Sequence, residues 1–347
     1  MAAQSAFKIG GHSVAPGTRR TVDLPVSVMS DHTPITMSVH VVHGKQPGPT
    51  LFVSAAIHGD EVMGVEVVRR ILRTPSLDTL RGTLLAVPIV NTFGFLHHSR
   101  YLPDRRDLNR TFPGSAAGSL AARLAHQFMT EIVSRSDVGI DLHSAAIHRT
   151  NLPQIRVSPR KPETMALAEA FGAPIVMTSK IRDGSLRQAA QRHDVDILLF
   201  EAGEGLRFDE LAVRTGVMGT LRVMRQLGML KAKGITKPHV APMRSSSSFW
   251  LRAPAGGLLR TLKAPGSHVE QGDILGLVSD PFGDVETEII ADEAGLIVGR
   301  TNLPVVNEGD GLFHVARIRQ RDDPAATIDL LAGQLEEDPL FDEDEII

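Results

Sequence analysis

Two short segments carry side chains that together could bind a metal ion. His58 and Glu61 stand three residues apart, directly after the apolar run 51–57, and His143 closes an Asp-Leu-His segment that follows the apolar residues 138–140. Two imidazoles and one carboxylate are the ligand set of a catalytic zinc site, in which a fourth position stays open for water or substrate. The sequence therefore predicts a zinc site held by His58, Glu61 and His143.

The spacing of these residues has a physical reason. Gly59 permits a tight turn between a strand and a helix expected near residues 61–73, and Asp60 is expected to cap that helix. Asp141 and His143 are two apart, so both point to the same side of a strand. A His-x-x-Glu pattern alone is a weak signal, and the alternative is a turn histidine followed by an ordinary acid of the first helical turn.

A loop between the two segments is rich in arginine. Residues 99–110 include Arg100 and Arg110, and Asn109 precedes the second of these. A guanidinium group binds a carboxylate through two parallel hydrogen bonds, and a neighbouring amide adds another donor. We expect an anion-binding loop rather than a solvated one, and therefore an anionic small-molecule substrate.

A third apolar run, residues 196–200, ends in Glu201, and open α/β sheets place their chemistry at strand ends. A carboxylate beside a zinc-activated water can take its proton and later give it to the leaving amine. Glu204 is the competing candidate, and we expect it to be a surface acid. Arg182 and Arg187 are candidates for contact with a distal substrate carboxylate.

Composition excludes several classes of protein. The chain has 347 residues and a formal net charge of −3, and this negative charge argues against nucleic-acid binding. It contains no cysteine, which excludes disulfides and thiolate metal sites. No apolar run approaches the roughly 20 residues of a membrane helix, and the N-terminus does not resemble a signal peptide. We expect a cytoplasmic protein that does not bind membranes.

The order of periodic segments predicts an α/β fold. Residues 1–235 alternate strands with helices after an N-terminal hairpin at 15–45, which indicates a mixed sheet flanked by helices on both faces. Strands are expected near 20–29, 35–43, 50–57, 83–90, 137–143, 174–178 and 196–202, and helices near 61–73, 117–134, 162–171, 184–193 and 209–227.

The C-terminal third has a different pattern. Residues 236–248 are typical of a linker, and residues 249–320 alternate short strands with glycine turns, which predicts a small all-β domain similar to biotinyl/lipoyl-like barrels. We expect Phe249 and Trp250 in its core. The domain either covers one side of the active-site cleft or mediates contacts in a homo-oligomer. Residues 321–347 are expected to form an acidic, mobile tail.

Five segments, in this order, resemble the succinylglutamate desuccinylase and aspartoacylase family, a branch of the zinc carboxypeptidase-like hydrolases. They are residues 56–61, 99–101, 107–110, 141–143 and 200–203. The resemblance implies a zinc-carboxypeptidase-like fold and one zinc ion per chain, bound by His58, Glu61 and His143. It also implies Glu201 as general base and acid, and substrate contacts from Arg100, Asn109 and Arg110.

Members of this family hydrolyse the amide of an N-acyl amino acid or a related acylated amine. Aspartoacylase-like members use a tyrosine from the C-terminal domain, whereas the single tyrosine here is Tyr101. The resemblance is closer to members of the family without an assigned substrate, or to members that act on N-acetylated diamino acids, and the sequence does not choose between these two groups. A metallocarboxypeptidase acting on short peptides and a non-catalytic metabolite-binding protein are the alternative functions.

Overall fold

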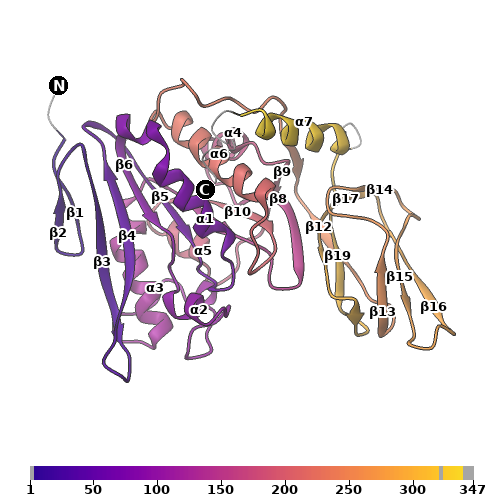
Figure 1. Cartoon of the computed structure of the whole chain (residues 1–347). Coiled ribbons are helices and arrows are strands. Elements are labelled where there is room, and N and C mark those ends of the chain that lie inside the picture. The colour runs from indigo at the N-terminus through magenta and orange to yellow at the C-terminus, as the bar shows by residue number, and fades with distance from the viewer. Residues whose placement is uncertain (1–3, 320–322, 339–347) are drawn as a thin grey trace.

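The computed structural model describes residues 4–319 and 323–338, and a long mixed β-sheet crosses the molecule (Figure 1). In its N-terminal part, the strands from β10 to β6 are parallel and the two beyond them are antiparallel. The strand order is β8 (Arg149–Val157), β10 (Asp196–Gly203), β7 (Val138–His143), β5 (Gln46–Ala55), β6 (Arg81–Val87), β4 (Pro34–His43) and β3 (Thr18–Val28). Two short strands, β9 (Ile175–Thr178) and β11 (Met243–Ser245), extend the sheet beyond β8.

Helices cover both faces of this sheet. One core packs against α1 (Met63–Arg73), α4 (Pro162–Phe171), α6 (Glu210–Gln226) and α7 (Pro324–Glu336). The other packs against α3 (Leu120–Glu131), α5 (Leu186–Gln191) and the hairpin of β1 (Phe7–Ile9) and β2 (His12–Val14). The remaining helical segments are α2 (Thr92–Leu96) and the 3-10 turns Pro75–Thr79, Leu108–Arg110 and Val133–Arg135. None of the helices in the described part of the chain combines the length and apolar character needed to cross a membrane.

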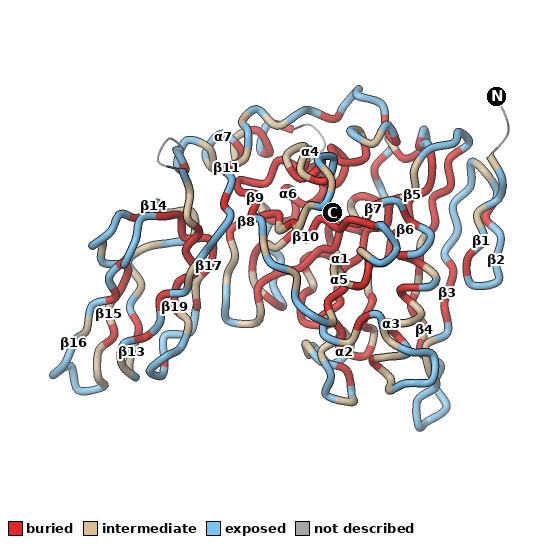
Figure 2. The backbone as a smooth tube through the Cα atoms, turned by 180° about the vertical axis from the view of Figure 1, so that it is seen from behind, coloured by how far each residue is buried: buried red, intermediate tan, exposed pale blue. Residues whose placement is uncertain are grey.

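The central strands carry continuous apolar runs in the parts where both of their faces are buried. In β5, Leu51 and Val53 belong to the first core and Phe52 to the second. Parallel strands covered by helices on both sides have this continuous apolar pattern. Figure 2 shows the resulting concentration of buried residues along β5, β7 and β10.

The C-terminal domain is attached through the sheet itself. Its strand β17 (Gly295–Thr301) pairs with β8, and β19 (Gly311–Ala316), β12 (Ser248–Arg252) and β14 (His268–Val269) continue from it. A second antiparallel sheet has the order β16 (Glu286–Ile290), β15 (Ile274–Ser279), β13 (Gly257–Thr261) and β18 (Val305–Val306). A separate hydrophobic core lies within this domain. The predicted fold class, an α/β domain plus a small all-β domain, is confirmed.

Several elements differ from the expectations. The strands β1 and β2 and helix α2 were not predicted, and β11 lies within the segment expected to be a linker. Strand β8 (Arg149–Val157) was not predicted, although it lies between β10 and β17. Helix α7 (Pro324–Glu336) lies in the segment expected to be a mobile tail, and its Leu331 and Leu335 are buried in the first core. This apolar pair explains why α7 is ordered. Residues 339–347 of the expected tail lie outside the described residues.

Candidate functional site

A sharp turn after β5 places the first two candidate ligands. Glu61 N donates to His58 O over 3.1 Å, which closes the turn. A Cβ on Gly59 would lie 1.9 Å from the carbonyl carbon of Gly94, so only glycine fits there. The expectation that Asp60 caps α1 is wrong: the helix begins at Met63 without a side-chain cap, and Asp60 is buried with one unpartnered carboxylate oxygen.

The structure brings His58, Glu61 and His143 together at the ends of β5 and β7. Their potential ligand atoms lie within 4.8 Å of one another, and all three residues are buried. The two Glu61 oxygens contact the two imidazoles, with Oε1 2.7 Å from His58 Nδ1 and Oε2 2.6 Å from His143 Nδ1. Residues 82 apart in sequence meet because the parallel strands β5 and β7 are paired. This group could hold one metal ion.

The outward-facing nitrogens of both imidazoles contact carboxylates. His143 Nε2 lies 2.8 Å from Asp141 Oδ2, and His58 Nε2 lies 3.1 Å from Asp107 Oδ1. Ser54 Oγ donates to the other oxygen of Asp141 over 2.8 Å. Carboxylates in these positions fix the ring orientation and raise the basicity of metal-binding histidines. Both Nδ1 atoms therefore face the space that a metal would occupy.

The electrostatics of the group are dominated by its single central carboxylate. Burial disfavours the ionised form of Glu61, but His58 and His143 outweigh burial and lower its pKa well below the usual value. Burial likewise opposes protonation of His143, yet Asp141 and Glu61 raise its pKa well above the usual range. Metal ligands must be deprotonated, so metal binding here would release protons from the imidazoles.

Arg100 braces this group from outside. Its guanidinium donates to Glu61 Oε1 over 3.2 Å and to Asp107 Oδ2 over 3.0 Å. The same side chain lines the pocket beside the group, together with Asn109 and Arg110. Asn109 Oδ1 accepts from Leu186 N over 2.9 Å, and the side chain of Arg110 is exposed. The three residues expected to contact substrate thus line one pocket.

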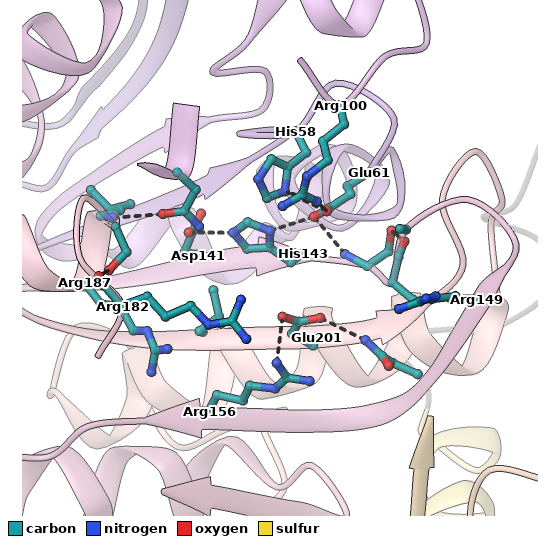
Figure 3. Close-up of a pocket in the computed structure, with 18 of the residues that line it drawn as sticks. His58, Glu61, Arg100, Asp141, His143, Arg149, Arg156, Arg182, Arg187 and Glu201 are labelled. Carbon is teal, nitrogen blue, oxygen red and sulfur yellow. Dashed lines mark hydrogen bonds and ion pairs between the residues drawn. The ribbon is translucent and has the colours of Figure 1, made fainter. Parts of the chain in front are cut away.

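Glu201 lies across this pocket from the histidines (Figure 3). The cavity has a volume of about 200 Å³. Pairing between β10 and β7 places Glu201 beside His143 in register. Asn151 Nδ2 donates to Glu201 Oε2 over 2.9 Å, and an Arg156 guanidinium nitrogen lies 3.4 Å from Oε1. Two contacts from β8 therefore hold the carboxylate in place.

Glu204, the competing acid, and His148, which follows the third candidate ligand, both lie apart from the buried group. Glu204 accepts hydrogen bonds from the His148 backbone N–H and from the Asn302 amide, and it does not line the pocket. The His148 side chain is exposed and makes no contact with the buried group.

Several pocket residues escaped the sequence interpretation. Arg149, Asn151 and Arg156 come from the unpredicted strand β8, while Trp250 and Arg300 come from the C-terminal domain. Expecting Trp250 in the barrel core was wrong, because the residue is 36% exposed and lines the pocket. Its ring stacks on His314 at a centroid distance of 4.8 Å, and the Arg149 guanidinium lies 5.3 Å from its centroid. The C-terminal domain therefore forms part of the pocket wall.

The buried His314 behind Trp250 should make stability depend on pH. Burial, together with the charges of Arg156 and Arg182, lowers the pKa of His314 to about 3, against about 6.5 in an unfolded chain. Between these two pKa values only the unfolded chain binds the proton. His314 therefore costs no stability above pH 6.5, and the free energy of unfolding decreases as the pH falls from 6.5 towards 3. The slope is at most about 1.4 kcal/mol per pH unit.

We therefore expect His314→Gln to remove roughly 2 kcal/mol of the stability difference between pH 7 and pH 5. Urea unfolding at the two pH values measures this difference. His268→Gln, at an exposed histidine of the same domain, is the control. An unchanged difference in the His314 variant would contradict the account of this residue.

Known proteins resemble this chain in sequence. A model of the succinylglutamate desuccinylase/aspartoacylase catalytic domain matches residues 47–227. The N-alpha-acetyl-L-2,4-diaminobutyric acid deacetylase of Halomonas elongata is 25% identical over 283 residues, covering 78% of this chain and 83% of the relative.

Solved structures share the fold. The succinylglutamate desuccinylase/aspartoacylase of Rhodobacter sphaeroides has a TM-score of 0.77 at 22% identity and covers 87% of this chain and 96% of its own. The product-bound structure of the ectoine utilization protein EutE of Ruegeria pomeroyi has a TM-score of 0.77 at 24% identity. The match covers 86% of this chain and 94% of the EutE chain. Because the family match spans more than half of its length, the chain belongs to the succinylglutamate desuccinylase/aspartoacylase family.

Proposed function

We propose that this protein is a zinc-dependent amidohydrolase that removes the acyl group from a small N-acyl amino acid or related amine. One observation carries the proposal: a buried His58–Glu61–His143 group faces Glu201 across a single pocket. The deacetylase named among the relatives supports hydrolysis of an amide.

The donor set fits a zinc ion. Two imidazoles and one carboxylate form a three-residue site with an open fourth position, as in catalytic zinc sites. The contacts of Asp107 and Asp141 with the outer nitrogens leave both Nδ1 atoms directed inward. A bound zinc ion would polarise the substrate carbonyl and lower the pKa of a water molecule.

Glu201 would act as the proton carrier of the reaction. Its carboxylate takes a proton from the attacking water, and the same oxygen then delivers it to the departing nitrogen. Asn151 and Arg156 fix the carboxylate, so the group is oriented before substrate enters. The products are a free carboxylate and a free amine.

Residues of the 100–110 loop would position the substrate. Arg110 is exposed at the pocket, and among the described residues its guanidinium donates only to the backbone carbonyl of Asn109, so it can bind a carboxylate. Arg100 is already bonded to Glu61 and Asp107, and we assign it to holding the group in place beside the developing oxyanion.

Release of free amine by the zinc-loaded protein tests this function. A panel of N-acetyl, N-succinyl and N-formyl amino acids and diamines, assayed with and without a chelator, is expected to contain one subset that is hydrolysed only when metal is present. Short peptides complete the panel. Release of C-terminal residues from peptides, without any turnover of N-acyl amino acids, would contradict the proposal and favour a carboxypeptidase.

A further inference from the structure

Strand β8 holds the Glu201 carboxylate through both of its oxygens (Figure 3). Asn151 Nδ2 donates to Oε2 over 2.9 Å, and an Arg156 guanidinium nitrogen lies 3.4 Å from Oε1. A carboxylate that transfers a proton must be directed at the reacting atoms, and a small misplacement lowers the rate. The orientation of Glu201 therefore depends on what holds Asn151 and Arg156 in turn.

Strand β8 changes its neighbour beside the pocket. Residues 149–151 pair with β17 of the C-terminal domain, whereas residues 154–157 pair with β9. Val298 of β17 lies at this fork, where the pairing of β17 with β19 shifts register between Ile297 and Gly299. Backbone carbonyls at a fork need donors from side chains, because the strand ladder does not supply them.

The Gln154 amide provides such donors. The side chain is completely buried, and its Nε2 donates to Val298 O over 3.1 Å and to Leu152 O over 3.2 Å. Its Oε1 accepts a hydrogen bond from Arg156 Nε over 3.3 Å. Gln154 is also the residue of β8 directly opposite Glu201 on β10. One amide group thus links the C-terminal strand to the guanidinium that contacts Glu201.

The other oxygen of Glu201 depends on β17 as well. Gly299 is paired with Asn151 in the ladder between β17 and β8. A Cβ on Gly299 would lie 2.6 Å from Asn151 Oδ1, although the backbone of this glycine lies outside the left-handed region. Space for the amide of Asn151, and not backbone conformation, therefore requires glycine here.

We propose that strand β17 positions Glu201 through Gln154 and Gly299, so that the C-terminal domain contributes to proton transfer as well as to the pocket wall. Neither residue lines the pocket. Both are positioning residues, and they act through Arg156 and Asn151 respectively. This inference rests on the role proposed above for Glu201.

Gln154→Met removes the linking amide at nearly constant side-chain length. In the full-length, zinc-loaded protein we expect kcat to fall by roughly ten- to 100-fold, because the proton carrier is no longer held in place. KM should change by less than about threefold, since the substrate contacts remain. The solvent deuterium isotope effect on kcat should increase as proton transfer becomes slower.

Gln334→Met is the matched control. This buried glutamine of α7 also bonds to backbone groups, donating to Lys237 O and accepting from His239 N, but it does not line the pocket. Its substitution should lower stability without changing kcat or the isotope effect. The same loss of kcat and the same rise of the isotope effect in both variants would assign the effect to destabilisation and overturn the inference.

Gly299→Ala tests the second contact. The added Cβ should displace the Asn151 amide and give the same kinetic changes as Gln154→Met. Gly256→Ala, in the same domain, is its control, because the nearest atom lies 3.7 Å from the added Cβ. Full activity of Gly299→Ala with an unchanged isotope effect would remove Gly299 from the proposal.

A double-mutant cycle with Glu201→Gln separates positioning from general destabilisation. If Gln154 acts through Glu201, Gln154→Met should lower the residual kcat of Glu201→Gln by less than about twofold. Equal losses in both backgrounds, or an unchanged kcat in the single variant, would overturn the inference and leave the hydrolase function intact. Unchanged turnover in Glu201→Gln alone would instead remove the role of Glu201, and the inference with it.

Crystal structures of Gln154→Met and of the original protein give an answer that does not depend on turnover. We expect the Arg156 guanidinium and the Glu201 carboxylate to be displaced in the variant. If both groups keep their positions, the inference is wrong even if no compound of the panel is hydrolysed.

Discussion

Replacing Glu201 with glutamine is expected to lower kcat by about 10² to 10⁴, the usual contribution of a general acid–base group. The amide keeps the shape of the side chain and can still accept a hydrogen bond from Asn151 or Arg156, so the pocket should stay intact. It cannot carry a proton from water to the leaving nitrogen. Steady-state kinetics measure the loss, and elemental analysis should show full zinc content in the variant.

Glu204→Gln is the matched control for this experiment. Glu204 lies three residues further along the chain, but its carboxylate accepts hydrogen bonds from His148 and Asn302 outside the pocket. Its substitution should leave kcat within about twofold of the original value, since a group outside the pocket makes no contact in the transition state. Unchanged turnover in Glu201→Gln, or a large loss of turnover in Glu204→Gln, would contradict the assignment of Glu201 as the proton carrier.

Replacing His143 with alanine is expected to weaken zinc binding by more than about 100-fold, because even changes behind a metal ligand cost 10- to 100-fold. The change removes one of three buried donors and leaves Glu61 with His58 as its remaining histidine partner. Hydrolysis should fall to the level of chelator-treated protein. Zinc affinity measured by competition with a chromophoric chelator checks the first effect, and amine release checks the second.

His148→Asn provides the comparison for that loss. This exposed histidine lies five residues after His143 and adopts a left-handed backbone conformation, with φ of 65°, which asparagine tolerates. Its side chain does not reach the buried group, so zinc affinity should not change. Full zinc retention by His143→Ala would remove His143 from the proposed ligand set.

Local patterns were sufficient for the central strands and for the grouping of the three candidate ligands. The apolar runs before His58, His143 and Glu201 correspond to β5, β7 and β10, because a short continuous apolar run is typical of a strand buried on both faces. Parallel pairing then brings strand ends together at one edge of the sheet. The distance between Glu61 and His143 follows from that pairing, even though 82 residues separate them.

Strand β8 could not be recognised in the same way. It contains Pro153, and its Asn151 and Arg156 are polar because they line the pocket. A strand that carries site residues loses the apolar pattern by which strands are identified. Its place in the sheet depends on pairing with β10 and with β17, more than 130 residues later in the chain.

Contributions of the C-terminal domain were hidden for a related reason. Trp250 has the composition expected of a core residue, and only the pairing of β17 with β8 shows that its domain borders the pocket. Asp60 does not cap α1 as expected, because the turn that positions Glu61 shifts the start of the helix to Met63. Tertiary contacts determine both features, and local sequence carries no record of them.

Titration of zinc into metal-free protein, followed by amine release from the best substrate of the panel, tests the central claim most directly. If His58, Glu61 and His143 form the metal site of an amidohydrolase, activity should rise in proportion to added zinc and reach its maximum at one equivalent per chain. Full turnover before zinc is added, or none in protein that has bound one equivalent, would contradict the account.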